Sequence, residues 1–76
     1  MKVYILVINA EGLAYAGPMD RTEVCFCPKW FKSRDEAEGY RDAACEEACV
    51  KLQEEQSCYE WLSRNAYATV FELDEA

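Results

Sequence analysis

Cysteine is the residue type in this chain with the widest chemical range, because thiolates bind metals, pair as disulfides and act as nucleophiles. The sequence contains five cysteines and no histidine. They are Cys25, Cys27, Cys45, Cys49 and Cys58. Cys45 and Cys49 are one helical turn apart, which separates their Cβ atoms by about 5–6 Å, more than the roughly 3.5–4.5 Å of a disulfide. Cys25 and Cys27 point the same way from one expected strand, so we expect neither local pair to form a bridge.

The same spacing bears on zinc binding. Structural zinc sites commonly have about two to four residues between paired cysteines. The helical pair meets this condition, but the strand pair does not, and histidine, the other common ligand, is missing. We therefore predict no metal or other cofactor and interpret the cysteines as small apolar side chains in a reduced core. Disulfides or a zinc site formed between strand and helix are the alternatives.

The residue patterns of common catalytic sites are missing from the sequence. It has no histidine, no glycine-rich phosphate loop and no nucleophile elbow. Asp20 and Glu23 could form a carboxylate pair, but no general base accompanies any of the cysteines. We therefore predict no catalytic residues and no enzymatic activity.

Carboxylates are the second group with a clear spacing. Residues 33–60 contain three basic and nine acidic residues, a net charge of −6, against −7 for the whole chain. At helical spacing they form two rows, Asp35, Asp42 and Glu46 in one and Glu36, Glu47 and Glu54 in the other. Such rows can enter a basic cleft on another protein as phosphates do, and they disfavour direct binding to nucleic acid or to anionic membranes. The alternative is a solvated helix face with an ordinary Glu47–Lys51 ion pair.

Aromatic residues lie at both ends of this acidic stretch. Trp30 and Phe31 precede it, and Tyr59 and Trp61 follow it. Tryptophan and tyrosine are frequent anchors of protein interfaces, so Trp30 and Trp61 are candidate contacts for a partner or for a second copy of the chain. Their alternative role is to fill core volume at the ends of a helix with a narrow apolar stripe.

An amphipathic helix predicted over residues 33–56 would position these groups. Ser33 and Glu36 form a capping box at its start, and Gly39 weakens its first turns. Its apolar arc consists of Ala37, Tyr40, Ala44, Cys45, Ala48, Cys49 and Leu52. Ser57 and Glu60 form a second capping box, which indicates a break and a short second helix. Continuation of the long helix to Arg64 is the alternative.

Strands are predicted on both sides of the helix. Residues 3–8 are apolar on both faces, as is typical of a strand that is covered on two sides or lies centrally in a sheet. Residues 13–16 would form a short hairpin partner, and residues 22–27 and 67–73 would form further strands. We predict an α+β fold of order β-β-β-α-β, a two-layer sandwich in which a three- to four-stranded antiparallel or mixed sheet carries the helix on one face.

Length and composition limit the possible protein classes. The 76 residues are expected to form one compact domain, residues 1–76, of a size at which a dimer interface often assists a small core. The apolar run at residues 3–8 is shorter than the roughly 7–15 residues of a secretion signal or the 20 or so of a membrane span. A cytoplasmic location is therefore expected.

These features together indicate a small, acidic, non-enzymatic binding protein. Our hypothesis is an inhibitor that occupies a basic, nucleic-acid-binding surface of a larger protein through its acidic helix. Phages and other mobile elements encode such inhibitors against host machinery, the anti-CRISPR proteins among them, and the inference rests on size and acidity as a class. The alternatives are a homodimer formed through an exposed sheet face or an aromatic patch, and a cysteine-based metal or redox module.

Overall fold

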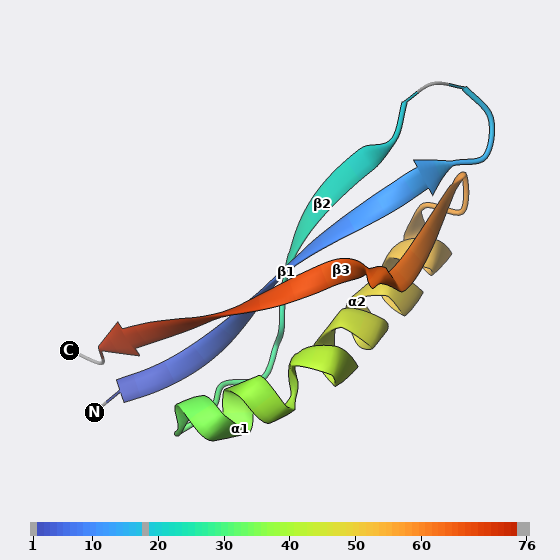
Figure 1. The fold of residues 1–76 in the computed structure, drawn as a ribbon. Helices are drawn as coiled ribbons and strands as arrows, with labels where there is room; N and C mark the ends of the chain where they lie inside the picture. The colour runs from blue at the N-terminus through green and yellow to red at the C-terminus, as the bar shows by residue number, and fades with distance from the viewer. Residues whose placement is uncertain (1, 18, 75–76) are drawn as a thin grey trace.

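The computed structural model describes residues 2–17 and 19–74. In this part of the chain the elements are β1 (Lys2–Ala14), β2 (Arg21–Phe26), α1 (Arg34–Gly39), α2 (Arg41–Glu55) and β3 (Tyr59–Asp74). The strands form an antiparallel sheet of order β2-β1-β3, and both helices pack on the same side of it (Figure 1). The predicted two-layer α+β fold is confirmed.

The predicted hairpin partner at residues 13–16 is wrong. β1 continues through Leu13 and Ala14, because these residues pair with Glu60 and Tyr59 of β3 rather than with the preceding strand. The same pairing excludes the predicted short helix after Ser57, since the chain is already extended from Tyr59 onward. A long-range strand contact overrides the local capping signal at this point.

The predicted helix is present but divided. The Glu36 N–H donates to the Ser33 hydroxyl at 3.2 Å, which is the backbone half of the expected capping box. Helix α1 ends at Gly39, and Tyr40, with φ −95° and ψ −2°, separates it from α2. The break therefore directly follows Gly39, the residue with the lowest helix propensity in the segment.

The core lies between the helices and the sheet and consists mainly of small side chains. Its buried members are Leu6, Ile8, Ala10, Cys27, Ala37, Ala44, Cys45, Cys49, Leu52, Trp61 and Ala68. Alanine and cysteine on the inner side of α2 allow the helix to approach the sheet closely. Trp61 fills the end of this layer near the end of α2 and packs over Gly12.

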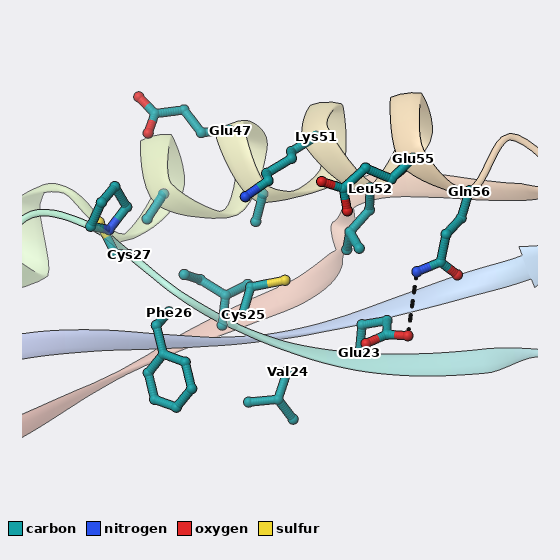
Figure 2. A pocket seen from close by; sticks show the side chains of 14 residues that line it. Glu23, Val24, Cys25, Phe26, Cys27, Glu47, Lys51, Leu52, Glu55 and Gln56 are labelled. Carbon is teal, nitrogen blue, oxygen red and sulfur yellow. Dashed lines mark hydrogen bonds between the residues drawn. The ribbon is translucent and has the colours of Figure 1, made fainter.

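The other face of the sheet is apolar, and no described helix covers it. Side chains alternate along a strand, so the neighbours of the buried Leu6 point away from the helices. The register places Val7 beside Phe26 of β2 and Ile5 beside Phe71 of β3. Figure 2 shows Val24 and Phe26 pointing away from α2. We define the open sheet face by its apolar residues Val3, Ile5, Val7, Val24, Phe26, Tyr67, Phe71 and Leu73; the polar residues on the same side of the sheet are Asn9, Glu11, Thr22 and Thr69.

Candidate functional site

The carboxylates that the sequence singles out lie on the solvent side of the two helices. All of them are exposed: Asp35, Glu36, Asp42, Glu46, Glu47 and Glu54. Helix α2 is oriented by its buried residues Ala44, Cys45, Cys49 and Leu52, which contact the sheet and leave the opposite side to water. The amphipathic pattern therefore predicted the exposure of these residues correctly.

Helix α2 brings part of the acidic set together. Its outer side forms a shallow hollow of about 440 Å³, lined by Ala43, Glu46, Glu47, Val50, Lys51 and Glu54. Val50 is exposed among the carboxylates, so this surface combines negative charge with an apolar contact point. Asp35 and Glu36 belong to α1, so the two predicted rows are interrupted at the junction between the helices. We call Asp42, Glu46, Glu47, Val50 and Glu54 the acidic α2 surface.

The predicted Glu47–Lys51 ion pair is not formed. Instead, the Tyr40 hydroxyl donates a hydrogen bond of 2.5 Å to a carboxylate oxygen of Glu47. The Lys29 ammonium group lies 4.2 Å from the centre of the Tyr40 ring, and its pKa is raised, chiefly by a hydrogen bond with the Tyr40 hydroxyl. Tyr40 therefore fixes one carboxylate of the acidic surface.

The arginines of the helices are directed toward the sheet rather than toward the carboxylates. The Arg41 Nε donates to the carbonyl oxygen of Ala68 at 3.0 Å. The Arg34 guanidinium carbon lies 5.5 Å from the centre of the Tyr4 ring. Within residues 2–17 and 19–74, the salt bridges connect strand residues and none involves a helical carboxylate. The carboxylates of the acidic α2 surface therefore form no salt bridge in the described part of the chain, and Lys51 is the basic residue that lines the same hollow.

The end of α2 carries charge that the helix dipole disfavours. Glu54 and Glu55 lie in its last turn, which has no basic residue. Carboxylates at a helix C-terminus face the negative end of the dipole and typically destabilise the helix by about 0.3–1 kcal/mol each. Lysine at these two positions would keep the protein equally soluble and would stabilise the helix. Solubility alone therefore does not explain why both positions are acidic.

A second concave surface lies between β2 and α2. Because α2 packs over β1 and β3, the inner side of β2 is left open as a groove of about 480 Å³ (Figure 2). Gln56 spans its end, donating from Nε2 to Glu23 at 3.4 Å. The pKa of Glu23 is lowered, first by the hydrogen bond from Arg21 and then by that from Gln56.

The thiol in this groove is poorly placed for chemistry. Burial is the main reason that the pKa of Cys25 is raised, and the carboxylates of Glu23 and Glu55 raise it further against the opposing effect of Lys51. A raised pKa keeps the thiol protonated near neutral pH and lowers its reactivity. The groove is therefore a concave surface without an activated nucleophile at Cys25.

All five cysteines are free in this structure. Cys27, Cys45 and Cys49 are buried, as expected for small core side chains, whereas Cys58 is exposed in the turn after α2. Burial raises the pKa of both Cys45 and Cys49. Among the described residues no cluster of three or more potential metal ligands occurs. The reduced state itself remains a prediction.

The two tryptophans have different environments. Trp30 is exposed, whereas Trp61 is 4% exposed and lies in the core. The indole N–H of Trp61 donates to the Gln56 carbonyl at 3.2 Å, which satisfies its polar group there. The assignment of Trp61 to a binding surface is therefore corrected: it fills core volume, the alternative role that the sequence allowed.

The sequence alone indicates an exposed sheet face only as one possible dimer surface, without identifying its residues. The sequence does carry a signal, since residues 3–8 are apolar on both faces and the period of two in residues 67–73 places Tyr67, Phe71 and Leu73 on one face. These patterns become informative only when the position of the helices is known.

Neither helix of the described chain is both long and apolar enough to span a membrane. No protein-family model matches the sequence, and no curated protein or solved structure is significantly similar to it.

Proposed function

We propose that this protein is a non-enzymatic binding protein that docks its acidic α2 surface onto a basic, nucleic-acid-binding surface of a larger protein. The observation that carries the proposal is that none of these carboxylates forms a salt bridge in the described part of the chain, while Arg34 and Arg41 are engaged on the sheet side. A cleft that binds phosphates presents the complementary charge, which accelerates association and favours this partner class.

The composition of the surface supports direct contact rather than long-range attraction alone. Interfaces gain most of their affinity from desolvated side chains surrounded by polar groups. Val50 occupies such a central position, with Glu46 and Glu54 one helical turn away on either side. The hydrogen bond from Tyr40 holds Glu47 in place and reduces the side-chain entropy lost on binding.

Occupation of such a surface would exclude nucleic acid from it. The protein would then act as an inhibitor of the kind that phages and other mobile elements direct against host machinery, as anti-CRISPR proteins do. This role implies a cytoplasmic location and no direct contact with nucleic acid or membranes. It is supported by size, acidity and the arrangement of the helical charges.

The test is capture from a nuclease-treated lysate of host cells with three baits. They are the wild type, Glu46→Lys/Glu54→Lys, and a control, Glu11→Lys/Asp74→Lys, at exposed strand positions. Each exchange adds two positive charges, so both variants change the net charge from −7 to about −3 and differ only in where they do so. Glu47 is left intact because its bond to Tyr40 is structural.

We expect the wild type and the control to recover a basic nucleic-acid-binding protein that the α2 variant does not recover. The wild type should also displace labelled DNA or RNA from that protein. Equal recovery by all three baits, or capture without displacement, would contradict the proposal.

A further inference from the structure

In the second half of β3, residues 66–73, the larger apolar side chains point away from the helices. The helix side of this segment contains Ala66, Ala68 and Val70, whereas Tyr67, Phe71 and Leu73 lie on the open sheet face. An antiparallel sheet with one face in water normally alternates apolar inside and polar outside. Here the larger apolar side chains are on the side that the chain leaves uncovered.

The central strand β1 also has apolar side chains on the side that the helices leave uncovered. Leu6 and Ile8 are buried under the helices, and Val3, Ile5 and Val7 point to the other side. Residues that are apolar on both faces are typical of a strand with cover on two sides. The helices supply one cover, so the second must come from outside the described chain.

Charge is compatible with a second copy of the chain as this cover. The apolar residues of the open sheet face carry no charge, and Glu11, on the same side of the sheet, lies beyond them toward the end of β1, so a strongly charged partner would gain little complementarity there. Two copies, each of net charge −7, repel one another through their helices. Packing the sheets face to face would put the two helix layers roughly 30 Å apart, from about 10 Å between the sheets and the width of each helix layer. This separation exceeds the Debye length of about 8 Å at physiological salt.

The exposed area is of the size that a stable interface needs. Phe26, Tyr67 and Phe71 are 70%, 62% and 48% exposed. At about 150–250 Å² for a fully buried aromatic side chain, these three alone leave on the order of 350 Å² open in each copy. Doubled for two copies and increased by the aliphatic residues of the face, the buried total approaches the roughly 1,000 Å² expected of a specific interface.

We infer that the open sheet face is the interface of a homodimer, with the two sheets packed face to face across a two-fold axis and the helices outside. Sheets packed in this way lie about 10 Å apart with strands aligned within about 30°. Each β1 would lie at the centre of the interface, and the same surface serves both copies, as two-fold symmetry requires. The dimer would present two acidic α2 surfaces on opposite sides. The inference stands on the sheet and not on the proposed function of α2.

The first test is the molar mass measured by light scattering and sedimentation equilibrium. The wild type should give about 17.6 kDa at micromolar concentrations, twice the 8.8 kDa of one chain. Val24→Asp and Val50→Asp form a matched pair, because the two valines are 53% and 55% exposed, while Val24 points away from α2 and Val50 lines the hollow on the outer side of α2. We expect Val24→Asp to raise the dimer Kd at least 100-fold and Val50→Asp to leave it unchanged, with circular dichroism reporting the fold of each.

An isotope-filtered NOE experiment on mixed labelled and unlabelled protein locates the interface without a mutation. Contacts should appear between the Val7 methyl groups of one copy and the Phe26 or Phe71 ring of the other. A wild type of 8.8 kDa at all concentrations, a dimer that Val50→Asp dissociates instead, or intermolecular contacts confined to the outer edges of β2 and β3 would each overturn the inference.

Discussion

The indole ring of Trp61 packs against Gly12 so closely that a Cβ atom at residue 12 would lie 2.7 Å from Trp61 Cζ2. The Trp61 backbone N–H also donates to the Gln53 side chain at 3.0 Å, and its indole N–H donates to the Gln56 carbonyl. One residue of β3 therefore joins β1 to the last turns of α2. This contact fixes the end of the helix that carries Glu54.

Substitution of Gly12 by alanine should destabilise the protein. The added methyl group cannot fit without displacing the rigid indole ring, and overpacking of this kind typically costs about 1–3 kcal/mol. Urea unfolding followed by tryptophan fluorescence measures the loss. Gly39→Ala is the control, because nothing lies within 4 Å of its added Cβ, and it should be neutral or stabilising by up to about 1 kcal/mol. Equal stability of the two variants would contradict the close contact between Gly12 and the Trp61 ring.

Neutralising the carboxylates at the end of α2 should stabilise the fold. Glu54→Gln and Glu55→Gln each remove an unfavourable interaction with the helix dipole, so we expect a gain of about 0.3–1 kcal/mol in low salt. The gain should shrink at about 1 M salt, where charges are screened over roughly 3 Å. Glu36→Gln, in the first turn of α1, should have the opposite sign. A loss of stability for the two α2 variants would contradict this account of the helix end.

The carboxylate of Glu72 should titrate below its ordinary range. The Tyr4 hydroxyl donates to it at 3.1 Å and Lys2 pairs with it at 3.3 Å, and these contacts, Tyr4 first, lower the pKa of Glu72. A lowered folded-state pKa contributes stability above the unfolded pKa, and this contribution is lost as the pH falls through the folded value.

The Tyr4→Phe variant tests this assignment, since it keeps the ring and removes the donor. The pKa of Glu72, followed by NMR of its carboxyl carbon, should move upward toward the ordinary glutamate value in the variant. Stability should also decline less between neutral and acidic pH than in the wild type. An unchanged titration of Glu72 would rule out the hydroxyl as the cause.

Alkylation should distinguish the cysteines by burial. Cys58 is exposed, whereas Cys45 and Cys49 are buried thiols with raised pKa values. Iodoacetamide without reductant should therefore modify Cys58 first in the native protein, and all five thiols after unfolding. Intact mass gives the number of adducts. Fewer than four alkylated thiols in the unfolded protein would show that disulfides are present and that the reduced-core interpretation is wrong.

Features with local causes were predictable from the sequence. The start of the helix at Ser33, its weakness at Gly39 and the exposure of Glu46 follow from capping, propensity and periodicity. The extension of β1 to Ala14 and the strand at Tyr59 were not predictable, because each depends on the other across 45 residues of sequence. Local signals cannot report such pairings.

The candidate site also combines features that the sequence predicts with features that depend on the fold. Periodicity alone placed the carboxylates on one side of the helix. The contact between Tyr40 and Glu47 and the bond from Arg41 to the Ala68 carbonyl depend on how the helices pack on the sheet. That these carboxylates form no salt bridge in the described part of the chain is therefore a property of the fold rather than of composition.

The most direct test of the acidic α2 surface is the affinity for the captured partner, measured at several salt concentrations for the wild type, Glu46→Lys/Glu54→Lys and Glu11→Lys/Asp74→Lys. We expect Kd to rise steeply with salt and the α2 variant to bind at least tenfold more weakly, about 1.4 kcal/mol or more, while the strand control binds like the wild type. Equal affinities for the two variants, or a Kd independent of salt, would show that the helical carboxylates are a solvated surface and not the binding site.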